Sequence, residues 1–243
     1  MVYLTVARND KVTPWNKGKT KFTDPNVKKI SDTFKTKRLD NFSKWREKSR
    51  VMGIIPYTTK DLVKSKELAF LIGLSLGDGN ISKFPRTECL RLTLGSDKPR
   101  LANYAVEVIK QIFNKSPSII KRYNSNCFNV TIYQKNLGKR LNIPIGARGS
   151  LEILFPSWIW KKKQYLISIL KGLFEAEASY CVHEKTYTYN FEFSNRNFSL
   201  LNETEKALRI LGFNPERRVT AVRLRKKIEA IDFKNLINFR VYP

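Results

Sequence analysis

Two acidic residues stand at matching places in the sequence and could act together in one site. Asp78 follows the apolar segment LIGLSLG and Glu177 follows LKGLFEA, each five residues after a glycine, Gly73 or Gly172. Both segments are expected to be helical, and a carboxylate at a helix C-terminus is disfavoured by roughly 0.3–1 kcal/mol because the helix dipole is negative there. Either acid alone would be interpreted as an ordinary exposed residue. The matched pair indicates a site for a hard divalent cation such as Mg²⁺, which binds carboxylates and backbone carbonyls.

The two acids belong to an internal repeat. ELAFLIGLSLGDGNIS in the first copy matches YLISILKGLFEAEASY in the second, and an alternating strand begins seventeen residues after each motif glycine, at Leu90 and at Tyr189. In both strands the apolar residues share one face and the polar residues share the other. If the two helices packed along their motif glycines, both carboxylates would emerge at the same end of the helix pair. The repeat therefore predicts two similar halves that bring the acids together.

Each half reads as helix, two strands, helix, two strands, helix. This order predicts an α+β fold, a pseudo-twofold pair of αββαββα halves that each contain one antiparallel sheet covered by helices on its apolar face. The closing helices are expected to begin near Asn136 and near Asp232. The expected divisions of the chain are a basic N-terminal extension (1–66), a first half (67–141), a linker (142–163) and a second half (164–243).

The N-terminal extension contains 17 Lys or Arg residues and 6 Asp or Glu residues. Near-helical spacing of apolar residues between about residues 26 and 53 predicts one or two short helices. The aromatic residues of the extension include Trp15, Phe22, Phe34 and Trp45. This aromatic content favours an accessory DNA-binding arm over the alternative, a solvated or disordered basic tail.

The overall charge of the chain indicates a polyanionic partner. Among 243 residues, 46 are Lys or Arg and 21 are Asp or Glu, a formal net charge of +25. Nucleic acid is favoured over an anionic membrane, since no apolar run approaches the roughly 20 residues of a membrane-spanning helix. We expect an intracellular protein located with the host DNA. The single histidine and the three cysteines without CxxC spacing argue against zinc and histidine-rich metal sites, so oxygen ligands are expected.

The polar faces of the two sheets are the expected nucleic-acid surface. Arg, Asn and Thr side chains can contact base edges in a major groove, whereas Lys mainly contacts phosphates. The alternative is a solvated sheet face, which would mix charge signs more evenly. The residues assigned to this surface are Arg91, Thr93, Lys121, Arg122, Asn129, Thr131, Tyr133, Lys135, Asn190, Glu192, Arg223 and Arg225.

With these motifs and this repeat, the chain resembles a two-motif, single-chain LAGLIDADG homing endonuclease over roughly residues 67–243. The resemblance implies a monomer whose two sheets form a saddle on double-stranded DNA and which hydrolyses both strands of a long target, leaving short 3′ overhangs. It also implies that Asp78 and Glu177 are catalytic metal ligands, supported by the backbone carbonyls of Gly77 and Ala176. The implied cofactor is Mg²⁺, with Mn²⁺ or Ca²⁺ as other occupants.

The resemblance extends to residues around the metal site. Ser96 and Asn195, each 23 residues after a motif glycine, are candidates for ordering water. A lysine near each scissile phosphate is expected, and the candidates are Lys161, Lys162 and Lys163. His183 is a candidate DNA contact, with a surface histidine of no role as the alternative.

Two positions of the second motif depart from the family pattern. Ala178 replaces the final glycine and would strain the turn if that position required a positive φ. Glu175 occupies the sixth motif position, where capping or solvation is expected rather than metal coordination.

Other functions are compatible with the same fold and charge. One is a non-cleaving nucleic-acid binder, either an intron RNA maturase with intron RNA as its partner or a DNA-binding regulator. Another is a structural ribosome-associated protein. The two intact acids favour the nuclease, because a binder gains nothing from carboxylates that face phosphates. Since the polar faces of the two halves differ in sequence, an asymmetric target is expected.

Overall fold

A computed structural model describes residues 13–37, 40, 42–52, 61–122 and 125–242 of the chain. The chain forms two compact units, Met1–Ile55 and Pro56–Pro243. The division of the chain expected from the sequence remains a prediction.

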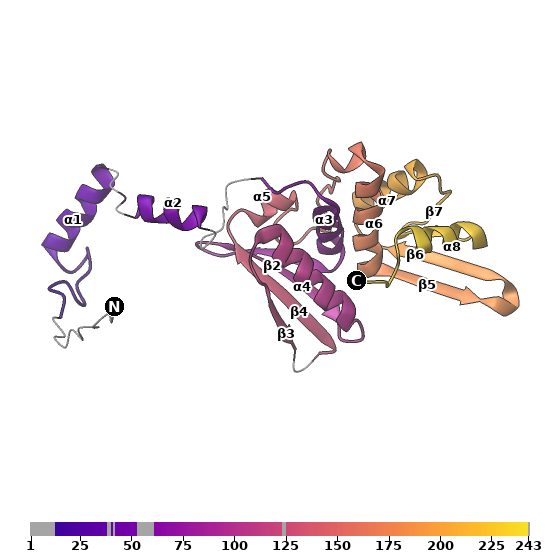
Figure 1. Cartoon of the computed structure of the whole chain (residues 1–243), viewed down its shortest axis with the longest axis horizontal. Helices are drawn as coiled ribbons and strands as arrows, with labels where there is room; N and C mark the ends of the chain where they lie inside the picture. The colour runs from indigo at the N-terminus through magenta and orange to yellow at the C-terminus, as the bar shows by residue number, and fades with distance from the viewer. Residues whose placement is uncertain (1–12, 38–39, 41, 53–60, 123–124, 243) are drawn as a thin grey trace, which may run out of the picture. The chain divides into compact units, whose positions relative to one another are not determined.

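The first unit contains two helices, α1 (Pro25–Thr36) and α2 (Ser43–Val51), drawn in indigo in Figure 1. The Asp24 side chain caps α1 by accepting hydrogen bonds from the backbone N–H groups of Asn26 and Val27. None of the residues of α1 is buried. The aromatic side chains of this unit are exposed, namely Trp15, Phe22, Phe34, Phe42 and Trp45.

The second unit begins with a half built around one antiparallel sheet, whose strand order is β1-β2-β4-β3. Strands β2 and β4, each eight residues long, are the two central strands, and the alternate leucines of β2 are buried. The elements of this half are α3 (Lys66–Asp78), β1 (Gly79–Lys83), β2 (Glu88–Gly95), α4 (Pro99–Phe113), β3 (Ser118–Lys121), β4 (Cys127–Gln134) and α5 (Leu137–Leu141).

A second half repeats this topology, with the strand order β5-β6-β8-β7. The matching order confirms the α+β fold with two similar halves. The elements are η1 (Ile159–Lys161), α6 (Lys163–Glu177), β5 (Ala178–His183), η2 (Glu184–Thr186), β6 (Thr188–Ser194), α7 (Phe198–Ile210), β7 (Glu216–Arg217), β8 (Ala221–Leu224) and α8 (Lys227–Leu236).

The start of the last helix differs from the expectation. The sequence placed it near Asp232, whereas α8 begins at Lys227. The backbone N–H of Ala230 bonds to the carbonyl of Lys226, and Glu229 lies in the first turn, where the helix dipole favours an acid. The basic residues before Asp232 had been assigned to the preceding strand.

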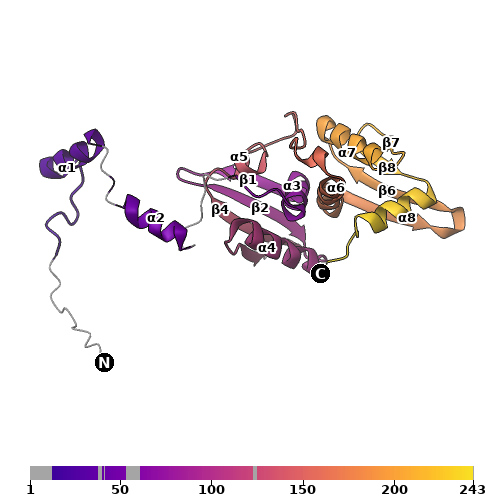
Figure 2. The same ribbon diagram turned by 45° about the horizontal axis from the view of Figure 1, so that its top comes forward.

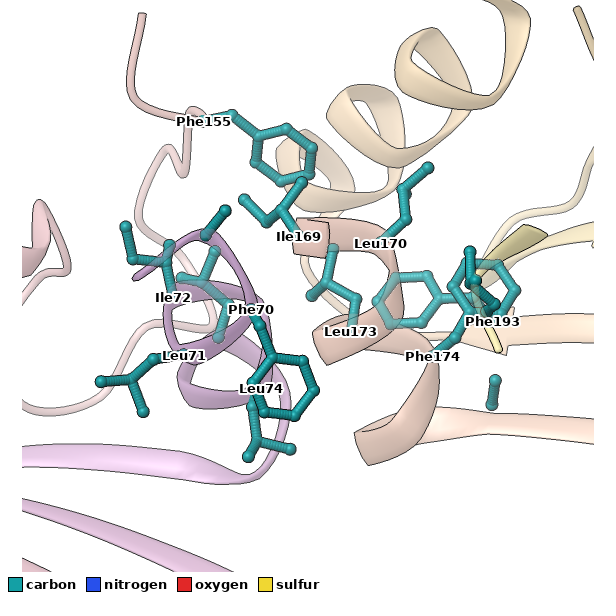
Figure 3. Close-up of a cluster of buried hydrophobic side chains, with 14 of the residues drawn as sticks. Phe70, Leu71, Ile72, Leu74, Phe155, Ile169, Leu170, Leu173, Phe174 and Phe193 are labelled. Atoms are coloured by element: carbon teal, nitrogen blue, oxygen red, sulfur yellow. The ribbon is translucent and has the colours of Figure 1, made fainter. Parts of the chain in front are cut away.

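Helices α3 and α6 lie side by side and join the two halves (Figures 1 and 2). Their approach requires glycine: a Cβ atom on Gly73 would lie 2.1 Å from the carbonyl oxygen of Ile169, and one on Gly172 would lie 2.2 Å from that of Phe70. Buried side chains surround this contact, and Figure 3 shows Leu74 and Leu173 among them. The expected packing along the motif glycines is therefore correct.

The core of the second half is aromatic. Phe174 of α6 contacts the rings of Phe191 and Phe193 on β6, with centroid distances of 4.9 and 5.7 Å, and the ring of Phe233 on α8 at 4.9 Å. Such ring pairs stabilise beyond the area they bury. The last turns of α6 are thereby fixed against the sheet, which sets the position of the acid that follows.

Of the helices that the structure describes, none combines the length and apolar composition needed to cross a membrane.

Candidate functional site

The C-terminal ends of α3 and α6 meet, and each ends in an acid. Asp78 is the last residue of α3 and Glu177 is the last residue of α6. A Cβ atom on Gly77 would lie 2.4 Å from the Cβ of Ala176 and 3.2 Å from the Cγ of Glu177. The two chain segments are thus in direct contact at the motif ends, and the two carboxylates emerge at the same end of the helix pair.

The electrostatics of the two acids suit a bound cation. Burial and the nearby negative charge of Glu177 raise the pKa of Asp78 to about 7, and Lys98 opposes this shift. Partial burial of its carboxyl group also raises the pKa of Glu177, again opposed by Lys98. Within the described residues neither carboxylate has a hydrogen bond or an ion pair. Two desolvated carboxylates without hydrogen-bond or ion-pair partners repel each other, and a hard divalent cation between them would neutralise that repulsion.

The possible ligand set is small. Within the described ranges, no group of three or more His, Cys, Asp or Glu side chains is placed to hold a metal ion. A cation at the motif ends would therefore take its remaining ligands from backbone carbonyls, water or a bound substrate. The predicted carbonyl ligands, Gly77 and Ala176, lie beside the two acids.

Lys98 is a site residue that the sequence reasoning missed. It precedes α4 in the first half, and its Nζ donates a hydrogen bond of 3.3 Å to the carbonyl oxygen of Glu175 in the second half. Its charge acts on both Asp78 and Glu177. A single lysine in a turn of a chain this rich in lysine gives no signal in the sequence. Only the packing of the two halves distinguishes it.

The lysines predicted for the scissile phosphate lie elsewhere. Lys161 is in η1 and Lys163 begins α6, whereas Glu177 ends the same helix. A helix of 15 residues with a rise of about 1.5 Å per residue separates these ends by roughly 20 Å. Lys161, Lys162 and Lys163 therefore lie far from the acids, whereas the charge of Lys98 acts on both of them.

Asn195 and Glu177 line one cavity. This cavity of about 610 Å³ is lined by Glu177, Ser194, Asn195, Arg196 and Thr220. The side-chain oxygen of Asn195 accepts a hydrogen bond of 2.8 Å from the backbone N–H of Asn197, which fixes its orientation. Arg196, which the sequence analysis did not select, adds an exposed positive charge to this cavity. Ser96 stands at the corresponding turn after β2, where its backbone N–H donates to Asn126.

The outer face of the first sheet is polar and mostly accessible. Arg91, Thr93 and Tyr133 are exposed, and the Thr93 hydroxyl bonds to the Asn129 side chain at 3.2 Å. Thr131 is the exception, because it is only 8% exposed at the centre of the sheet and offers little surface to a partner. The prediction for Lys121 is wrong, because this residue pairs with Phe128 and so shares the helix-covered face of Leu94, although it is exposed at the sheet edge. Arg122 and Lys135 directly follow strands β3 and β4 and are exposed.

The outer face of the second sheet carries both charge signs, contrary to the basic face expected from the sequence. Arg223 lies across the sheet from Glu192 and Glu216. Glu216 accepts two hydrogen bonds from the Arg223 guanidinium, at 2.9 and 3.1 Å, and Glu192 lies 3.9 Å from it. Arg225 is exposed. Cross-strand pairing therefore neutralises much of the charge that was counted as available for phosphates.

Asn190 and His183, two predicted DNA contacts of the second half, lie in different surroundings. The Oδ1 atom of Asn190 is buried with no hydrogen-bond partner among the described atoms. His183 ends β5 in an exposed position, where its Nδ1 lies 2.7 Å from the hydroxyl of Thr186.

Glu175 does not cap or face solvent, as the sequence had suggested. Its side chain is 1% exposed and accepts a hydrogen bond from the backbone N–H of Arg240 at 2.5 Å and another from the Tyr242 hydroxyl. Burial raises the pKa of Glu175, against the lowering effect of these hydrogen bonds. The Tyr242 ring contacts Tyr104 of α4 at 5.7 Å, so the C-terminal segment spans both halves.

Ala178 causes no strain in the second motif. Its φ is −95°, and the corresponding Gly79 in the first motif has a φ of −102°. Both values are ordinary for an extended residue, so the motif does not need glycine for a positive φ here.

Known proteins share the fold of this chain. No family model matches the sequence, and no curated protein matches it. A structure of mesophilic variants from the homing endonuclease I-DmoI aligns with 71% of this chain and 94% of its own, at 16% identity and a TM-score of 0.50. I-DmoI in complex with DNA and Mn aligns with 71% and 96%, at 16% identity and a TM-score of 0.50.

A further match is full-length DUF199/WhiA from Thermatoga maritima. It aligns with 73% of this chain and 57% of its own length, at 17% identity and a TM-score of 0.51. At such identities these likenesses show the fold alone. The resemblance to the LAGLIDADG family is confirmed at that level, and the activity of the chain must be argued from its site.

Proposed function

We propose that this protein is a site-specific endonuclease that hydrolyses both strands of duplex DNA with a divalent metal ion. The observation that carries the proposal is the convergence of Asp78 and Glu177, without protein partners, at the shared end of α3 and α6. Mg²⁺ is the proposed cofactor, and I-DmoI was crystallised with DNA and Mn.

The chain's own residues divide the work at this site. Asp78 and Glu177, with the carbonyls of Gly77 and Ala176, would hold the cation. When bound, such an ion supplies activation of water and stabilisation of the leaving oxygen. Lys98 would donate to a phosphate oxygen close to the acids. Asn195 would orient water in the cavity beside Glu177.

The proposed partner is a long, asymmetric duplex. The exposed polar residues of the two sheet faces differ, and the second face carries paired charges of both signs, so the two half-sites should differ. Both half-sites would be bound by one chain, which makes a monomer sufficient. Under the same proposal, cleavage leaves short 3′ overhangs and the protein is located with the host DNA.

A non-cleaving binder of DNA or intron RNA is the alternative. The likeness to DUF199/WhiA at a TM-score of 0.51 shows that this fold is not confined to proteins with homing endonuclease in their description. The raised pKa of Asp78 favours the nuclease, since a binder has no reason to desolvate an acid beside another acid.

Duplex binding should weaken steeply with salt. If six to ten phosphates are contacted, the affinity should fall by about 10³- to 10⁵-fold between about 50 and 200 mM salt, because counterions are released. The measurement is fluorescence anisotropy of a labelled duplex over a salt series. Lys135→Ala should lower the slope by about one, as expected for the loss of one phosphate contact. An affinity that hardly changes with salt would contradict the assignment of a nucleic-acid surface to this part of the chain.

Removing the Lys98 ammonium should slow cleavage more than it weakens binding. Lys98→Met should reduce the cleavage rate by about 10²-fold, the usual effect of losing one donor to a developing charge. Single-turnover cleavage and anisotropy separate the two effects. Lys110→Met, at an exposed position of the helix α4 that follows Lys98, is the matched control. If both variants lost the same cleavage rate, Lys98 would contribute only to the overall positive charge of the protein and would have no specific role at the site.

The proposal is tested on a randomised duplex library. The purified protein is incubated with the library and either Mg²⁺ or EDTA, and the new DNA ends are sequenced. Ends that share one long asymmetric site, with short 3′ overhangs and only with Mg²⁺, are expected. Tight binding with no metal-dependent ends would favour the non-cleaving binder.

A further inference from the structure

Arg148, in the segment between the two halves, contacts the end of α3 on both sides of Asp78. Its Nη1 donates to the carbonyl oxygen of Ser75 at 2.9 Å, and its Nη2 donates to the carbonyl oxygen of Gly79 at 2.5 Å. Ser75 lies three residues before the acid and Gly79 follows it directly. A planar guanidinium that bonds both carbonyls fixes the intervening peptide groups more firmly than a single bond would.

The second half fixes Arg148 in turn. The Nδ2 atom of Asn197 donates to the carbonyl oxygens of Arg148 and Leu151, both at 2.8 Å. Farther along the same segment, the Ser199 hydroxyl accepts from the backbone N–H of Ile153 at 2.7 Å. The segment is therefore attached to the start of α7, and its arginine reaches across to the first half.

Lys98 in the first half corresponds in repeat position to Asn197 in the second half, and Asn197 holds Arg148. Lys98 and Asn197 each lie 25 residues after a motif glycine and directly precede a helix, α4 or α7. Lys98 reaches from the first half to the end of α6, where it bonds the Glu175 carbonyl. Asn197 has no charge, but it holds the arginine that reaches the end of α3. Each helix end thus receives a cation that is anchored on the opposite half.

We propose that Arg148 is a positioning residue for Asp78. It fixes the acid at the end of α3 relative to the second half, so that Asp78 and Glu177 keep the spacing that one cation requires. The inference rests on the proposed function, because it assigns Arg148 to the metal site of that function. A cation at a helix C-terminus is also favourable by itself, since the last carbonyls are partly negative.

A purely electrostatic role and a positioning role of Arg148 predict opposite effects on metal affinity when this residue is replaced. Removing a positive charge near two carboxylates should strengthen cation binding if Arg148 acts only through its charge. Removing a contact that positions a ligand should weaken it. The sign of the change therefore separates a positioning role from a purely electrostatic one.

The experiment measures Mn²⁺ binding to the full-length protein by electron paramagnetic resonance of the free ion. Arg148→Gln should weaken Mn²⁺ binding by about tenfold or more, the usual cost of losing a group that orients a metal ligand. Arg148→Lys keeps the charge but bonds only one carbonyl, and its affinity should lie between wild type and Arg148→Gln. The control is Arg209→Gln, which removes an exposed arginine paired with Glu205 and should leave the affinity unchanged.

Circular dichroism melts establish that each variant is folded at the temperature of the titration. If Arg148→Gln does not fold, the charge-conserving Arg148→Lys decides the question. Unchanged or tighter Mn²⁺ binding in a folded Arg148 variant would overturn the inference. Asp78→Asn in the same titration separates the two levels: if it too leaves Mn²⁺ binding unchanged, the proposed metal site itself is wrong.

Discussion

Asp78→Asn and Glu177→Gln will each abolish metal-dependent cleavage while duplex binding persists. An amide keeps the size of the side chain but loses the negative charge that holds a divalent cation. The loss of several kcal/mol of transition-state stabilisation corresponds to a rate decrease of about 10³-fold or more. Binding should remain or tighten slightly, because each variant removes a negative charge from a surface that faces phosphates.

The measurement is single-turnover cleavage of the target recovered from the library, with anisotropy for binding. Neither variant should be destabilised, since burial disfavours the charged form of both carboxyl groups and raises the pKa of each. Asp232→Asn, which removes an exposed acid on α8, is the control and should cut at the wild-type rate. Cleavage that survives in either acid variant would refute the assignment of that acid.

Gly172→Ala will separate the two helix ends and should have the largest effect on stability. The new Cβ would lie 2.2 Å from the carbonyl oxygen of Phe70 and 2.5 Å from the backbone nitrogen of Leu74, and backbone atoms cannot move aside as a side chain does. Such overpacking costs about 3 kcal/mol. Cleavage should fall by about 10²-fold even at temperatures where the variant is folded, because a displacement of about 1 Å in a catalytic site has that effect.

Thermal melts and cleavage rates measure the two consequences. Gly149→Ala is the matched control, because a Cβ at Gly149 would meet no atom within 4 Å. It should match wild type in both measurements. A Gly172→Ala protein with wild-type stability would show that α3 and α6 do not need this close approach.

The fold and the acid pair were predictable because their signals are local and repeated. The offset from Gly73 to Leu90 equals that from Gly172 to Tyr189, and alternation along each strand identifies its buried face. Two matching copies also specify which helices must pack together. The positions of Asp78 and Glu177 follow from that packing alone.

The residues that surround the acids could not be predicted, because their partners are distant in sequence. Arg148 contacts a carbonyl 73 residues away, Lys98 one 77 residues away, and Glu175 bonds a backbone group 65 residues away. None of these pairs follows a helical or strand period. They arise only when the halves, the intervening segment and the C-terminal segment pack together.

Charge on the second sheet was misjudged for a related reason. Alternation placed Glu192 and Arg223 on the outer face correctly, but strand register decides which charges are neighbours. The pairing of β8 with β6 and β7 sets Arg223 beside two glutamates. Register between strands is determined by the whole sheet and cannot be read from one strand.

We propose that Asp78 and Glu177 together bind one divalent cation at the ends of α3 and α6. The most direct measurement is anomalous diffraction from crystals of the protein grown with Mn²⁺. An anomalous peak in contact with both carboxylates is expected. Crystals that contain Mn²⁺ but show no peak there, or a peak only elsewhere, would contradict the claim.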